Sequence, residues 1–197
     1  MKGRSVLAGA LALHAGSAFA HAGLKGIGDF YVGALHPLSA PEHVLAFLAL
    51  GILAAQQNPR GKPAVIAFCF TLALGAALAP VLPALPAVDV FNLASVLILG
   101  GLVALYRPMP RALLVALATV FGLGHGFANG IEISESTSAW QFIAGMTIAA
   151  LASIGYVMIL VDWLLRRKAA WIAIAVRVAG SWITAIGMLV LAAGLRG

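Results

Sequence analysis

A short stretch near the start of the chain combines two histidines with an acidic residue. It runs His36-Pro37-Leu38-Ser39-Ala40-Pro41-Glu42-His43 and is followed directly by a long apolar run. Imidazole nitrogen and carboxylate oxygen together suit borderline divalent ions such as Ni²⁺, Co²⁺ and Zn²⁺. His36, Glu42 and His43 are therefore predicted metal ligands.

Part of this stretch has a second interpretation, as the start of a helix. Ser39 and Glu42 have the S-x-x-E spacing of a capping box, and Pro41 suits the first helical turn. Glu42 can serve in both ways, and the capping box leaves His36 and His43 unexplained.

A second stretch, Gly122-Leu123-Gly124-His125-Gly126-Phe127-Ala128-Asn129-Gly130-Ile131-Glu132, carries another group of polar side chains. On a helix, offsets of four and seven residues put His125, Asn129 and Glu132 on one face. These residues are predicted to present an imidazole, an amide oxygen and a carboxylate to one ion. The alternative is that His125 and Asn129 are ordinary hydrogen-bond partners between helices. The interleaved glycines permit either close helix approach or a local break that exposes backbone carbonyls.

The composition indicates that both stretches lie in a membrane protein. The chain has 197 residues, of which 62% are hydrophobic and 9% charged, too few polar groups to cover a soluble domain. The net charge of +6 is not gathered into a basic stripe, so nucleic-acid binding is not expected. The single cysteine, Cys69, excludes an internal disulfide and a site of several thiolates.

Apolar runs bounded by proline, glycine and charge predict an all-α bundle of about six transmembrane helices. A span needs about 20 apolar residues, and a backbone in lipid must satisfy its own hydrogen bonds. The predicted spans lie near residues 41–57, 63–82, 88–106, 111–130, 138–165 and 169–194.

Residues 1–20 are predicted to be a cleaved signal peptide, which leaves residues 21–197 as a single membrane domain. Lys2 and Arg4 precede a short apolar run, and Ala18 and Ala20 supply the small residues of an A-x-A site. Cleavage would make His21 the mature N-terminus, and whether it joins the metal site stays open. The alternative is an uncleaved first helix.

The distribution of basic residues predicts the orientation of the bundle. Three connections are basic: those with Arg60 and Lys62, with Arg107 and Arg111, and with residues 166–168. The positive-inside rule places them in the cytoplasm. The mature N-terminus is then periplasmic and the protein lies in the bacterial inner membrane, in agreement with a signal peptide.

The two motifs together resemble the HupE/UreJ family of bacterial nickel permeases. The first is His-Pro-x-x-x-x-acid-His and the second His-Gly-x-Ala-x-Gly-x-Glu, in that order in a chain of six predicted spans. The resemblance extends to His21-Ala22-Gly23, to Asp89 at the start of the third span, and to the late pair Arg177 and Gly180.

The chain departs from the family pattern at two positions. Glu42 stands where the family typically has Asp, which keeps the charge, and Asn129 stands where it has a second His. An amide oxygen is a harder and weaker ligand than imidazole nitrogen, so these departures bear on selectivity for nickel.

The resemblance implies a permease that carries a divalent transition metal, expected to be Ni²⁺, from the periplasm to the cytoplasm. The ion is substrate, and no prosthetic cofactor or enzymatic activity is expected. The ion and the lipid bilayer are the expected partners. A membrane metalloenzyme or metal-dependent accessory protein could use the same residues, although the sequence contains no H-E-x-x-H motif. A structural membrane protein is a third possibility, which the gathering of His and acid at one side of the membrane argues against.

Overall fold

The computed structural model describes residues 28–83 and 85–194, so the predicted signal peptide and His21 lie outside the described residues. The described part is all-helical. Its helices are α2 (Asp29–Ser39), α3 (Pro41–Gln56), α4 (Lys62–Leu78), α5 (Val88–Leu105), α6 (Arg111–Ile131), α7 (Ala139–Leu165) and α8 (Ala170–Gly194). The six predicted spans correspond to α3 through α8, which confirms an all-α membrane protein.

The helices differ in how well their lengths suit a membrane. By length and composition, α5, α6, α7 and α8 can each cross it, and α2 with α3 passes the same test as a pair bent by 81°. Helix α4 is apolar but has 17 residues, or about 25 Å at 1.5 Å per residue. The described residues therefore contain four spans, or five with the bent pair, and α4 is slightly short of the length expected from the sequence.

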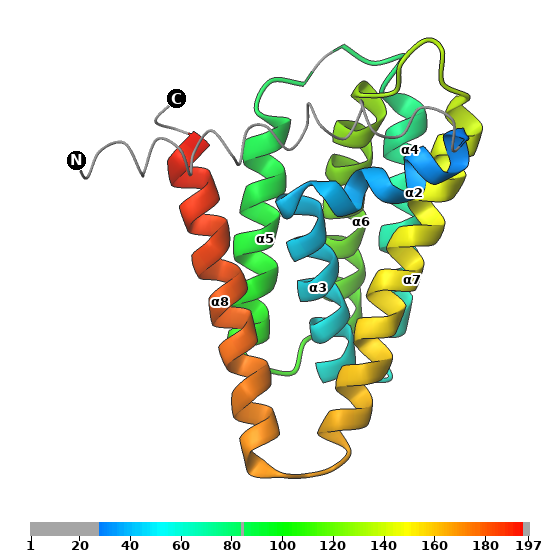
Figure 1. Cartoon of the computed structure of the whole chain (residues 1–197). Coiled ribbons are helices and arrows are strands. Elements are labelled where there is room, and N and C mark those ends of the chain that lie inside the picture. Colours follow the sequence, from blue (N-terminus) through cyan, green and yellow to red (C-terminus); the bar gives the residue numbers. More distant parts are fainter. Residues whose placement is uncertain (1–27, 84, 195–197) are drawn as a thin grey trace, which may run out of the picture.

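Helix α2 is an element that the sequence analysis did not predict. It lies across one end of the bundle, over the start of α3 (Figure 1). It packs on α7 at Gly33 and Gly145, where an added Cβ would overlap the backbone carbonyls of Phe142 and Phe30 respectively. Asp29 Oδ2 also accepts a hydrogen bond of 2.7 Å from the Ser138 backbone N–H. These contacts hold His36, in the last turn of α2, at a fixed place.

The turn between α2 and α3 differs from the predicted capping box. Ala40 is the N-cap of α3 and no side chain caps the helix, although Pro41 does occupy the first turn as expected. The Ser39 hydroxyl instead donates a hydrogen bond of 2.6 Å to the backbone carbonyl of His36. The capping-box interpretation of Ser39 and Glu42 is therefore wrong, because Ser39 ends α2 and its hydroxyl is directed backward along the chain.

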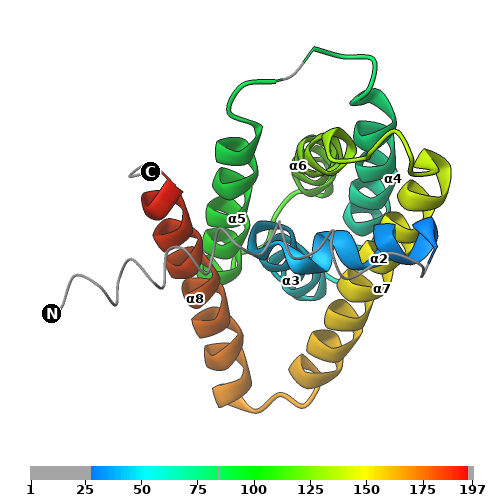
Figure 2. The same cartoon turned by 45° about the horizontal axis from the view of Figure 1, so that its top comes forward.

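Helix α6 stands between α4 and α5, with α3 beside it (Figure 2). Gly122, Gly126 and Gly130 recur every fourth residue and meet α4, where added Cβ atoms would overlap Phe68, Leu72 and Ala76. Small residues at such a spacing let two helices approach closely in a membrane. Helix α6 is continuous through Ile131, so the glycines serve close packing, and the alternative of a local break is wrong.

The two ends of the bundle carry different charges. The connections at residues 57–61, 106–110 and 166–169 lie at the end opposite α2, at the bottom of Figure 1. They contain the basic residues Arg60, Arg107, Arg166, Arg167 and Lys168. The connections at the other end contain no Lys or Arg within the described residues. We call these the basic end and the α2 end.

Candidate metal site

Two buried histidines meet between α3 and α6, near the α2 end of the bundle. His43, in the first turn of α3, is 4% exposed, and His125 of α6 is fully buried. Their Nδ1 atoms lie 2.6 Å apart, and their ring centroids are separated by 4.9 Å. The extended backbone of Ala40 turns the chain into α3 and so brings His43 from the first motif against His125 from the second.

Two further polar side chains complete this buried group. Asn129 Nδ2 lies 2.9 Å from His43 Nε2 and donates a hydrogen bond of 2.7 Å to the His125 carbonyl. The hydroxyl oxygen of Ser95, in α5, lies 2.8 Å from His125 Nε2. The Asn129 Oδ1 atom is buried without a hydrogen-bond partner. We call His43, Ser95, His125 and Asn129 the buried histidine site.

A second pair lies closer to the α2 end. His36 Nε2 is 3.0 Å from Glu132 Oε2, and the Glu132 side chain is 49% exposed. Glu132 follows the last residue of α6, where it is the C-cap. Its carboxylate therefore meets α2 rather than joining His125 and Asn129. Of the three residues predicted to share one helix face, His125 and Asn129 lie inside α6, whereas Glu132 lies just beyond its end.

A further acidic side chain, Glu42, lies within electrostatic range of this outer pair. Glu42 is half-buried, and its charge interacts with Asp89, Glu132 and His36. The two motifs thus meet twice, once at the His36–Glu132 pair and once at the buried histidine site.

The arrangement differs from a single compact site with five or six ligands. Among residues 28–83 and 85–194, no three His, Cys, Asp or Glu side chains are grouped so that they could hold one ion together. His125 and Glu132 are seven residues apart, or about 10 Å along a helix axis. The buried site nevertheless has ligand atoms that suit a borderline ion, namely two imidazoles and the unpartnered Asn129 Oδ1.

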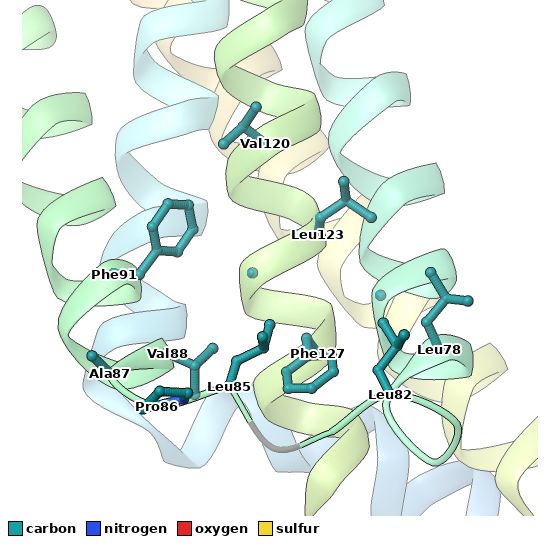
Figure 3. A pocket seen from close by; sticks show the side chains of 12 residues that line it. Leu78, Leu82, Leu85, Pro86, Ala87, Val88, Phe91, Val120, Leu123 and Phe127 are labelled. Atoms are coloured by element: carbon teal, nitrogen blue, oxygen red, sulfur yellow. The ribbon is translucent and has the colours of Figure 1, made fainter.

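A cavity of about 540 Å³ lies on another side of α6 (Figure 3). Phe91 of α5, Leu123 and Phe127 of α6 and Leu82 of the α4–α5 connection surround it. Its lining contains no imidazole, carboxylate or amide side chain. This cavity is therefore not a candidate metal site.

The chain is similar to proteins of a known family. The family model described as HupE / UreJ protein matches residues 9–190. The chain belongs to the HupE/UreJ family. Protein HupE of Rhizobium leguminosarum bv. viciae is 33% identical over 137 residues, which cover 68% of this chain and 70% of that protein. No solved structure is significantly similar to the chain.

Membership of the HupE/UreJ family confirms the resemblance found in the sequence. Proteins of this family are membrane transporters or accessory proteins and not enzymes, which confirms that expectation as well. The membership supports a role in metal transport.

Ser95 is a member of the buried site that the sequence analysis missed, because a single serine in the apolar run of α5 has no distinctive pattern. The signal that could have identified Ser95 is its spacing from Asn92. Asn92 and Ser95 are three residues apart and so share a helix face, and both are buried in the structure.

Proposed function

We propose that this protein is an inner-membrane permease that carries a divalent transition-metal ion, with Ni²⁺ as the expected substrate, from the periplasm to the cytoplasm. The observation that carries the proposal is the contact between His43 and His125. Ionisable groups are rare within membrane spans and face the bundle interior or a pathway for ions. Two imidazoles from different spans meet here beside an unpartnered amide oxygen.

The charges at the α2 end support capture of the ion from the periplasm. Glu42, Asp89 and Glu132 attract a divalent cation to this end. His36 and Glu132 then offer a nitrogen and an oxygen ligand at a partly exposed position. The buried histidine site lies deeper along α6. Two partial sites, one after the other along the path of the ion, suit transport. A permease must replace the hydration shell of the ion and yet bind the ion weakly enough to release it.

The ligand types favour a borderline ion over a soft one. Within the described residues no thiolate joins the site, since Cys69 is buried in α4. Asn129, in place of the second histidine typical of the family, makes the site less rich in nitrogen. We therefore propose that selectivity between Ni²⁺ and neighbouring ions depends on Asn129.

Uptake into proteoliposomes tests this function. Purified protein is reconstituted around a metal-sensitive dye, and Ni²⁺ entry is measured alone and in competition with Co²⁺, Zn²⁺, Mn²⁺ and Cu²⁺. Wild-type protein is expected to admit Ni²⁺ faster than protein-free liposomes. His43→Gln should abolish most of this flux. Thr71→Val is the control and should retain it, because the buried Thr71 hydroxyl bonds only carbonyls of its own helix. Tight binding without flux would overturn the permease proposal.

A further inference from the structure

The hydrogen bonds of Ser95 fix which nitrogen of His125 carries a proton. A hydroxyl has one hydrogen to donate and two lone pairs that accept. Ser95 donates that hydrogen to the backbone carbonyl of Asn92, at 2.6 Å. Its oxygen can therefore only accept from His125 Nε2, which lies at 2.8 Å. His125 Nε2 must carry the proton.

The other nitrogen of His125 then has a lone pair that is directed at His43. A neutral imidazole has one N–H and one accepting nitrogen, so His125 Nδ1 is the acceptor. It faces His43 Nδ1 at 2.6 Å. Asn129 Nδ2 donates to His43 Nε2 at 2.9 Å, which leaves the His43 proton on Nδ1. The bonds made by Ser95 and by Asn129 thus assign the same direction to the bond between the two rings.

We propose that Ser95 is a positioning residue for metal capture, which holds His125 as the Nε2–H tautomer and so presents Nδ1 as its metal-binding atom. This inference rests on the proposed function. Ligating histidines generally donate their other N–H to a fixed acceptor, which sets the tautomer and the ring orientation. Ser95 supplies that acceptor from α5, a helix that carries neither of the two sequence motifs.

The position of Ser95 suits this role better than a purely structural one. A buried hydroxyl that donates to a carbonyl of its own helix needs no further partner. Thr71 is an example, since its hydroxyl bonds only the carbonyls of Ala67 and Phe68. Ser95 is fully buried and has its accepting side turned to a ring nitrogen. If His125 were the Nδ1–H tautomer, a lone pair of its Nε2 would face a lone pair of the Ser95 hydroxyl oxygen at 2.8 Å. The Ser95 hydroxyl could avoid this only by giving up its hydrogen bond to the Asn92 carbonyl.

The test combines a spectroscopic measurement with metal binding on the purified full-length protein. Nitrogen-15 NMR of histidine-labelled, metal-free protein distinguishes the two tautomers, and His125→Gln identifies the His125 signals. We expect a single Nε2–H form in the wild type and in Thr71→Val. Ser95→Ala should populate both tautomers and bind Ni²⁺ with roughly 10- to 100-fold lower affinity. Its melting temperature should fall modestly, because the buried His125 Nε2–H loses its acceptor.

Two results would overturn the proposal. One is a wild-type spectrum with the His125 proton on Nδ1. The other is Ser95→Ala with wild-type affinity for Ni²⁺. A wild-type protein that binds none of Ni²⁺, Co²⁺ and Zn²⁺ would instead contradict the proposed function, and the spectra of the metal-free protein distinguish that failure from the first.

Discussion

Asn129 contacts both histidines of the buried histidine site, and its amide hydrogens and its oxygen have different surroundings. Its Nδ2 is engaged with His43 and with the His125 carbonyl, while Oδ1 has no hydrogen-bond partner. A buried carbonyl oxygen left without a partner is unfavourable by about 1–3 kcal/mol. Ligation of an ion by Oδ1 would recover part of this free energy.

Replacing Asn129 by histidine should shift the ion preference toward nitrogen-seeking metals. The added imidazole is a better ligand for Ni²⁺ than for Mn²⁺, and we expect about tenfold tighter Ni²⁺ binding relative to Mn²⁺, or ~1.4 kcal/mol. Maximal uptake should fall, because release is slower from a tighter site. Competition uptake at matched expression measures both effects. An unchanged ion preference would show that Asn129 lies outside the ligand set.

Replacing Glu132 by glutamine should weaken capture of all divalent ions with little change in selectivity. The substitution removes the carboxylate that faces His36 at the α2 end. We expect a severalfold higher half-saturation concentration for uptake. Glu135→Gln, which removes an equal charge from the same exposed connection, is the matched control. Equal behaviour of the two variants would contradict a specific role for Glu132.

Sequence patterns anticipated some of these residue contacts and missed others. The spacing of four placed His125 and Asn129 together, because both lie inside a regular helix. The same argument failed for Glu132, since α6 ends one residue before it. The pairing of His36 with Glu132 depends on where α2 lies relative to the end of α6, a tertiary relation that helical periodicity does not contain.

At the scale of elements, the buried histidine site depends on how closely α6 approaches α4. The glycines of α6 form one face, and His125 and Asn129 lie on an adjacent one. An added Cβ at Gly126 would overlap the Leu72 backbone, so any larger residue there must displace α6.

Substitution of Gly126 by alanine should therefore destabilise the protein by about 1–3 kcal/mol through overpacking. Gly101→Ala is the matched control, because an added Cβ at Gly101 of α5 has no neighbour within 4 Å. This control should be neutral or stabilising by up to ~1 kcal/mol through helix propensity. Thermal unfolding in detergent measures both. A Gly126→Ala protein as stable as Gly101→Ala would contradict the close contact of α4 and α6.

The helices themselves were largely predictable from sequence, and α2 was the exception. Long apolar runs ending at proline or charge define α3 through α8, with bounds that differ from the predicted ones by at most four residues. Helix α2 has 11 residues and an internal proline, Pro37, so it does not resemble a span. Its position follows from packing against α7.

At the scale of the whole molecule, the separation of charge between the two ends predicts the orientation. On a Cys69→Ala background, Ser136→Cys at the α2 end should react with a membrane-impermeant maleimide added to intact spheroplasts. Arg60→Cys at the basic end should react only after permeabilisation. This pattern follows from the positive-inside rule. The reverse labelling pattern would place the acidic α2 end in the cytoplasm and contradict uptake from the periplasm.

X-ray absorption at the nickel edge tests most directly whether the ion binds at the buried histidines. The measurement is made on purified protein loaded with one equivalent of Ni²⁺, for the wild type and for His125→Gln. The wild-type spectrum should contain scattering from imidazole rings together with oxygen ligands, and His125→Gln should lose one imidazole. A spectrum without imidazole scattering, or one that His125→Gln leaves unchanged, would contradict binding of the metal between His43 and His125.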